Sequence, residues 1–182
     1  MKILQVTPRY PPQSGGVETH VKKISERLVD RGHEVIVITA DAGNEGKRRE
    51  RRNGVFVRRY RSIAPNGVMH LCPQVVVAVR RADADVVHAH NYHSFPLFFA
   101  AAGIGDQRLV VTTHYHGGSA NSMRNRLLSL YLPFGRWAVR RADEVIAVSE
   151  WETERLKSDF GVDATVIPNG IEVDRFTDAE PI

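Results

Sequence analysis

Cysteine and long apolar stretches are almost absent from this chain of 182 residues. Its single cysteine, Cys72, cannot form a disulfide within the chain, and such sparse use of cysteine is typical of a reducing compartment. No apolar run approaches the roughly 20 residues that a membrane-spanning helix needs. The apolar segment at the N-terminus meets Pro8 and Arg9 too early to act as a signal peptide. We therefore expect a cytoplasmic protein of about one domain.

Two phosphate-binding signatures are absent as well. The sequence has no GxxxxGK[ST] segment, which excludes a P-loop nucleotide hydrolase. The pair Gly15-Gly16 does not form the GxGxxG fingerprint of dinucleotide-binding proteins. It does fall between a first strand and a first helix, where an open α/β sheet binds its ligands and free backbone N–H groups can receive an anion.

Strand-like and helix-like patterns alternate along the whole chain. The first unit is a buried strand pattern at Ile3, Leu4 and Val6, then apolar residues every three or four positions from Val17 to Leu28, then a second strand at 35–38. Further strands are expected at about 54–60, 85–89, 108–113, 144–148 and 164–167, and helices at about 68–82, 94–103, 120–142 and 150–159. Pro133 is expected to kink or split the longest helix. This alternation predicts an α/β fold with a Rossmann-like, doubly wound and mainly parallel sheet.

Histidines and glycines gather in the loops that follow the predicted strands. Because parallel strands end at one edge of the sheet, these loops share one cleft, which is our active-site hypothesis. His114 follows a buried strand directly. It can exchange a hydrogen bond with a sugar or act as a dipole near a reacting centre, or it can be a structural residue that holds its loop.

Two further motifs in these loops have structural explanations. The pairs His88-Ala89-His90 and His114-Tyr115-His116 resemble metal ligands, but no carboxylate cluster accompanies them at the strand ends, so we expect no metal. Ser149 and Glu152 have the spacing of a capping box at the start of a helix.

The net charge of +4 comes from one segment. Residues 47–61 hold eight basic residues and one acidic residue. One interpretation is a solvated loop that leads into an edge strand. The other is a surface for anionic lipid headgroups or a charged acceptor, formed by Arg48, Arg49, Arg51 and Arg52, which would keep the protein at the inner face of a membrane. Nucleic acid is not an expected partner, because no recognised binding motif accompanies these residues.

The chain contains six segments that together point to one family: KILQVTPRYPPQSGGVETHV, LVDRGHEVIVIT, DVVHAHN, VVTTHYHG, ADEVIAVSEWETERL and VIPNGIEVDRF. Their order resembles the N-terminal domain of family 4 retaining glycosyltransferases. The resemblance implies one half of a GT-B fold, with an acceptor-side domain at residues 1–170 and the start of an interdomain linker at residues 171–182. The donor-binding domain of this family, with its basic pair and Glu-X7-Glu segment, is expected to be missing.

The resemblance also implies roles for particular residues. Gly15 and Gly16 match the loop that approaches the donor diphosphate and the acceptor, and Glu18 matches an acidic residue in the first helical turn. His114 matches the histidine beside the transferred sugar and is the expected catalytic residue. Five residues are expected to border the acceptor cleft: Arg9, Tyr10, His90, Asn91 and Tyr115.

The implied reaction is transfer of a sugar from a nucleotide-sugar donor to an acceptor hydroxyl, with retention of the anomeric configuration. The nucleotide-sugar is a co-substrate, no metal cofactor is expected, and the acceptor is a sugar, a lipid-linked molecule or a small molecule. Since the donor domain is expected to be missing, the chain alone should be inactive. Two alternatives stay open: a non-catalytic acceptor- or membrane-binding subunit of a split transferase, and a metal hydrolase that uses the paired histidines.

Overall fold

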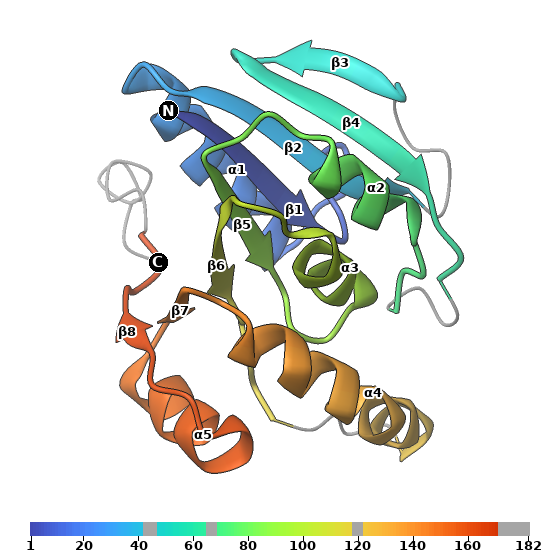
Figure 1. The fold of residues 1–182 in the computed structure, drawn as a ribbon, viewed down its shortest axis with the longest axis vertical. Coiled ribbons are helices and arrows are strands. Elements are labelled where there is room, and N and C mark those ends of the chain that lie inside the picture. Colours follow the sequence, from blue (N-terminus) through green and yellow to red (C-terminus); the bar gives the residue numbers. More distant parts are fainter. Residues whose placement is uncertain (42–46, 65–68, 118–121, 171–182) are drawn as a thin grey trace, which may run out of the picture.

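The structure, a computed structural model, describes residues 1–41, 47–64, 69–117 and 122–170. One eight-stranded sheet runs through this described part, in the order β3-β4-β2-β1-β5-β6-β7-β8 (Figure 1). The strands are β1 (Lys2–Thr7), β2 (Glu34–Asp41), β3 (Arg49–Arg52), β4 (Val55–Arg61), β5 (Val86–His90), β6 (Arg108–Thr112), β7 (Glu144–Ala147) and β8 (Thr165–Val166). The helices are α1 (Gly16–Asp30), α2 (Gln74–Arg80), α3 (Phe95–Gly103), α4 (Ser122–Arg140) and α5 (Glu150–Phe160).

The predicted fold class is confirmed. All neighbouring strands pair in parallel except β3, which is antiparallel to β4. The carboxyl ends of β1, β5, β6 and β7 therefore meet at one edge of the sheet, as the site hypothesis requires.

Side chains of successive strand residues enter two separate cores, because they point to opposite faces of the sheet. Leu4 and Val6 lie in the larger core, which α2, α3, α4 and α5 cover. Val35 and Val37 lie in the smaller core under α1, where Val21 is fully buried. Helices thus pack on both faces, as in a doubly wound sheet (Figure 1).

One strand differs from the sequence prediction. Residues 49–52 are predicted as a solvated loop, but they form the edge strand β3, joined to β4 by the two-residue turn Asn53-Gly54. Both turn residues have positive φ angles, 47° and 80°, which is the geometry of a type I′ hairpin turn and explains the Asn-Gly pair. A Cβ at Gly54 would also meet Val29 Cγ1 at 2.5 Å.

Two predicted helices differ in the structure. The helix expected at 68–82 is shorter, because the backbone of Leu71 pairs with that of Ile63 and α2 begins only after Pro73. The helix containing Pro133 is not split. Phe134 packs against Phe98 of α3, and the preceding turn of α4 is likewise held on α3, so packing on both sides of Pro133 offsets its missing N–H.

None of the helices in the described part of the chain combines the length and the apolar content that a membrane crossing requires.

Candidate functional site

Three histidine rings meet at the carboxyl edge of the sheet. His114 follows β6 and lies 4.9 Å from His20 of α1 and 6.1 Å from His90 at the end of β5, measured between ring centroids. The ring of His88 lies next to that of His90, with centroids 4.1 Å apart and planes tilted by 36°. His114 has a φ angle of 47°, so the backbone turns sharply at the point where it leaves the strand. The predicted gathering of histidines is present, but His20, whose role the sequence leaves open, belongs to it.

Buried hydrogen bonds fix the proton of His90. Its Nε2 lies 2.6 Å from Oε1 of Gln5, and an amide oxygen only accepts, so Nε2 carries the proton and Nδ1 is left with a free lone pair. Nδ1 of His90, Nε2 of His20 and Nε2 of His114 are buried atoms without hydrogen-bond partners among the described residues. The cluster therefore presents unsatisfied imidazole nitrogens at the carboxyl edge of the sheet.

Burial keeps these imidazoles neutral. It lowers the pKa of His114 to about 4, with a further contribution from His20. The pKa of His88 falls to about 3, and the pKa values of His20 and His90 are also lowered, chiefly by burial. At physiological pH His114 is thus a neutral hydrogen-bonding group and not a cation.

The same three residues could hold a metal ion. The candidate ligand nitrogens of His20, His90 and His114 all lie within 4.8 Å of one another. Neither predicted His-X-His pair forms this group, since His88 and His116 are outside it. Ligands of a tetrahedral zinc at 2.0–2.1 Å stand only about 3.4 Å apart, so at the widest separation the cluster would have to contract.

The glycine loop packs tightly on one side and is open on the other. A Cβ at Gly15 would lie 2.2 Å from Glu18 Oε2. The Glu18 side chain is buried and forms a 2.7 Å ion pair with Arg9, so the loop and the first turn of α1 are held together. A Cβ at Gly16 would meet no atom within 4 Å, and no side chain caps α1. The backbone N–H groups in the first turn of this helix thus have no side-chain cap and can receive an anion.

Glu152 of α5 fixes the segment that follows β6, a role that the sequence does not indicate. Its buried carboxylate accepts hydrogen bonds from the Thr113 hydroxyl and from the backbone N–H groups of Tyr115 and Val148. Ser149 Oγ accepts from the Glu152 N–H at 3.2 Å, so that half of the predicted capping box is confirmed. The carboxylate therefore holds Thr113 and Tyr115, the two residues that flank His114 in the chain.

Tyr10 and His90, two of the residues expected at the acceptor cleft, are buried in the structure. Tyr10 is 1% exposed and packs in the core under α1, where burial raises its pKa to about 12. His90 is fully buried and supports the cluster from below. Both residues are therefore internal in this structure, because the face of the sheet on which they lie is covered by α1.

The other three expected cleft residues keep more exposure. Arg9 is exposed and Asn91 is half-buried, with its side-chain oxygen accepting from the His93 N–H at 3.1 Å. Tyr115 donates to Asp159 at 2.9 Å, and burial raises its pKa to about 12. The Tyr115 ring also borders a small hollow of about 250 Å³ between α4 and the loop after β6. Tyr115 thus remains beside open space.

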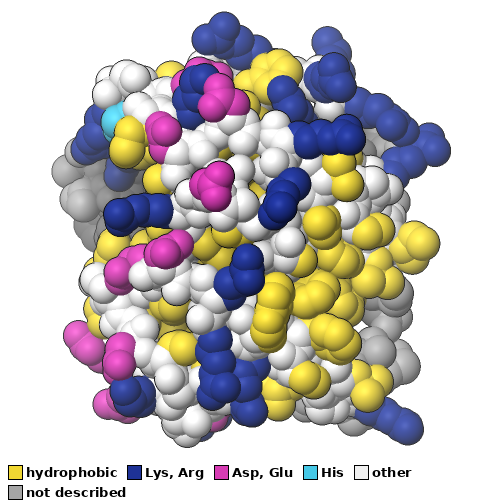
Figure 2. All heavy atoms as spheres, in the orientation of Figure 1, with side chains coloured by type: hydrophobic (Ala, Val, Ile, Leu, Met, Phe, Trp, Pro, Cys, Tyr) yellow, Lys and Arg dark blue, Asp and Glu magenta, His cyan; other side chains and the backbone are white. Residues whose placement is uncertain are grey.

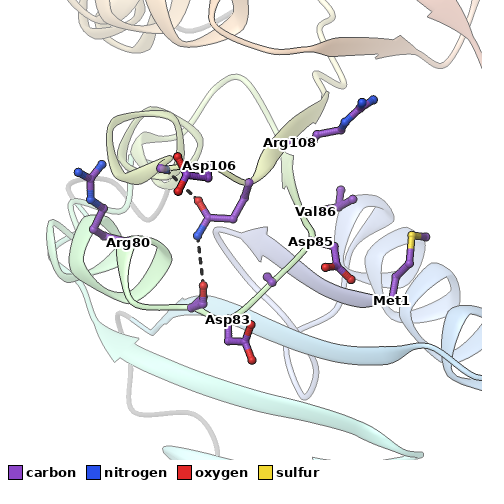
Figure 3. A pocket seen from close by; sticks show the side chains of 11 residues that line it. Met1, Arg80, Asp83, Asp85, Val86, Asp106 and Arg108 are labelled. Atoms are coloured by element: carbon purple, nitrogen blue, oxygen red, sulfur yellow. Dashed lines mark hydrogen bonds between the residues drawn. The ribbon is translucent and has the colours of Figure 1, made fainter.

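A larger hollow lies at the opposite edge of the sheet from this cluster. It has a volume of about 640 Å³ and sits at the amino ends of β1, β5 and β6, between Arg80, Asp83, Asp106 and Arg108 (Figure 3). One of its acidic groups is engaged, since Asp83 accepts from the Lys2 ammonium. In parallel α/β sheets ligands bind at the carboxyl edge, so this hollow is not the candidate active site.

The four predicted basic-patch arginines divide between two faces. Arg48 and Arg49 line a hollow of about 370 Å³ with arginines of β4. Arg51 is opposite Phe56 and is exposed, whereas Arg52 is opposite Val55, which lies in the core under α1. Arg52 therefore belongs to the other side of the sheet.

An open parallel sheet with a glycine loop and a polar, histidine-rich carboxyl edge defines a ligand-binding α/β domain. The sequence model of glycosyltransferase family 4 matches residues 14–175. The chain belongs to this family, and the predicted resemblance is confirmed.

Relatives of known function share this domain. A subunit of phosphatidylinositol N-acetylglucosaminyltransferase from Homo sapiens is 27% identical over 190 residues, which cover 96% of this chain and 38% of the relative. A GDP-mannose-dependent alpha-(1-6)-phosphatidylinositol monomannoside mannosyltransferase from Mycobacterium tuberculosis is 30% identical over 192 residues, which cover 96% of this chain and 46% of the relative. The chain thus spans less than half the length of these two relatives.

Solved structures confirm the fold. A sucrose-phosphate synthase from Thermosynechococcus elongatus superimposes with a TM-score of 0.75 at 16% identity, over 95% of this chain and 49% of that one. A glycosyltransferase from Rickettsia africae superimposes with a TM-score of 0.62 at 20% identity, over 99% of this chain and 46% of that one. The described sheet and helices therefore correspond to one half of a GT-B structure.

Proposed function

We propose that this chain is the acceptor-side half of a retaining hexosyltransferase, which moves a sugar from a nucleotide-sugar to an acceptor hydroxyl. One observation carries the proposal: the neutral His114 stands at the carboxyl edge beside the uncapped start of α1. A neutral imidazole can hydrogen-bond the transferred sugar without repelling a positively charged, oxocarbenium-like centre. The neighbouring N–H groups supply positive dipoles for the departing diphosphate.

The residues around His114 act through position. Glu152 fixes the backbone on both sides of it, and the ion pair of Arg9 with Glu18 fixes the glycine loop opposite. Such preorganised dipoles stabilise charge in the transition state without rearranging during the reaction. The proposed reaction needs no metal, and the second domain of the family would bring the nucleotide-sugar.

The acceptor that best fits is a lipid-linked hydroxyl. Both relatives described above are named for phosphatidylinositol-type molecules. On this chain the exposed Arg9 and the half-buried Tyr115 lie at the carboxyl edge, and Tyr115 borders a hollow. We accordingly place the working protein at a membrane surface, bound peripherally.

The test is a transfer assay on the polypeptide that joins this domain to a donor-binding domain of the family. We expect transfer by the joined protein and none by the 182-residue chain. His114→Ala should reduce kcat by about 100-fold or more, as loss of a transition-state contact does. His33→Ala, at the opposite edge of the sheet, is the control and should leave kcat unchanged. An unchanged kcat in His114→Ala would refute the catalytic role. A joined protein that binds acceptor without transfer would instead indicate a non-catalytic subunit.

A further inference from the structure

An arginine-rich hollow lies at the outer corner of the sheet. Five arginines line its volume of about 370 Å³: Arg48, Arg49, Arg58, Arg59 and Arg61. Arg59 is buried and pairs with Glu50 at 2.8 Å. The other four have no ion-pair partner among the described residues. A guanidinium binds phosphate oxygens through two parallel hydrogen bonds, so the hollow suits a phosphate-bearing group.

The positions of Arg49 and Arg58 follow from strand register. Tyr60 packs against the larger core, so its alternating neighbours Phe56 and Arg58 face the same side of the sheet. The Arg58 guanidinium lies over the Phe56 ring, 5.2 Å from its centroid. Arg49 is directly opposite Arg58 in the β3–β4 pair. The hairpin thus directs an arginine and aromatic surface toward the side that carries α2.

Exposed apolar residues continue this surface across the helices. We call them the apolar ridge: Ile63, Leu71, Val77, Leu130, Phe134 and Trp137. Ile63 is 72% exposed and Leu130 is 68% exposed. Figure 2 shows the basic side chains gathered over the β3–β4 corner and a broad apolar area beside them, over α2, α3 and part of α4. An apolar area of this breadth, rimmed by charge, marks a membrane or partner contact.

One arginine of the hollow also contacts the loop that leads to the candidate site. Besides its pair with Glu50, the guanidinium of Arg59 donates to the carbonyl oxygen of Pro11 in the loop before α1. Arg59 thus connects the hollow to the loop that carries Gly15-Gly16 into α1. The combination of cationic hollow and apolar ridge favours a lipid bilayer over a soluble polyanion, which would not need the ridge.

We infer that the arginine hollow and the apolar ridge form a docking surface for an anionic phospholipid bilayer. The hollow takes lipid phosphates, and the ridge enters the interface of the bilayer. This inference rests on the proposed function only for the choice of a lipid acceptor, since docking needs neither donor nor second domain. It also replaces the basic surface expected from the sequence, because Arg58 and Arg61 take part and Arg52 does not.

Sedimentation with vesicles tests the docking surface. We expect the chain to bind phosphatidylcholine vesicles that contain about 30 mol% phosphatidylglycerol, and to bind pure phosphatidylcholine much more weakly. The double variant Arg49→Gln/Arg58→Gln should weaken binding roughly 30-fold, at about 1 kcal/mol per arginine. The control Arg31→Gln/Arg52→Gln removes the same charge from the α1 side and should weaken binding less than about 3-fold.

A second pair of variants tests the ridge. Ile63→Ser/Leu130→Ser changes two side chains that are mostly exposed, so the fold should persist, which circular dichroism checks. It should weaken binding by at least about 5-fold, while Ile167→Ser, a half-exposed residue beyond β8, should not. Equal losses in both arginine pairs, or no binding to anionic vesicles, would overturn the inference. Dimerisation of the chain through the apolar ridge, detected by analytical ultracentrifugation, would also overturn the inference.

Discussion

Removing the Glu152 carboxylate gives the sharpest test of how this site is built. In Glu152→Ala, the Thr113 hydroxyl and the N–H groups of Tyr115 and Val148 lose their acceptor. Each buried donor left unsatisfied costs about 1–3 kcal/mol, so the loss of one acceptor for three donors should lower the free energy of unfolding by at least about 3 kcal/mol. In Glu152→Gln, the amide oxygen can still accept from Thr113 and Tyr115, but its NH₂ faces the Val148 N–H, and the loss should be about 1–3 kcal/mol.

Urea unfolding followed by far-ultraviolet circular dichroism measures both losses on the purified chain. Glu154→Gln on the same helix is the control, because that side chain is exposed and should change stability by less than about 0.5 kcal/mol. In the joined two-domain protein, Glu152→Gln should also lower kcat, since it loosens the backbone around His114. An Ala variant within about 1 kcal/mol of the parent chain would refute the argument that this carboxylate organises the loop.

Two further predictions concern pH and the glycine loop. The pKa of His114 is about 4 in the folded chain, below the value of about 6.5 expected in the unfolded chain. Between these two pH values the unfolded state binds a proton at His114 and the folded state does not. Stability in urea titrations should therefore fall as the pH decreases from about 6.5 to about 4, and His114→Asn should reduce that slope but not abolish it, because His20, His88 and His90 contribute with the same sign. Gly15→Ala should cost about 1–2 kcal/mol, because its Cβ would displace the Glu18 carboxylate from Arg9. Gly16→Ala should leave stability within about 1 kcal/mol but reduce transfer by the joined protein, and the reverse pattern would contradict our assignment of the loop.

The order of strands and helices can be predicted because each element has its own periodicity. In apolar runs such as that of β2, neighbouring residues are buried on opposite faces, as Val37 and Ile38 are, and no competing pattern interrupts them. The β3 strand escapes prediction for a different reason. Its residues are three arginines and one glutamate and show no apolar face, so its only local signal is the Asn53-Gly54 turn.

The site is predictable only where residues follow strands directly. His114 and Gly15-Gly16 can be found because parallel strands place their ends, and the loops that leave them, at one edge. Tyr10 belongs to the same loop, yet the chain folds its ring back under α1, and loop sequence alone does not specify that direction. The role of Glu152 is hidden because the same Ser-X-X-Glu spacing satisfies a helix cap as well as a loop anchor.

The histidine cluster shows how the two sides of the cleft are connected. His20 is one helical turn from the start of α1, and its ring touches His114 from the side of the glycine loop. A shift of α1 would therefore move a ring that packs on the candidate catalytic residue. Because Nε2 of both His20 and His114 is buried without a partner among the described residues, a polar group that reaches these atoms would satisfy them. Under the proposed function, a sugar hydroxyl would supply such a group and satisfy a buried polar atom at the same time, which would link acceptor or donor binding to the stability of the cluster itself.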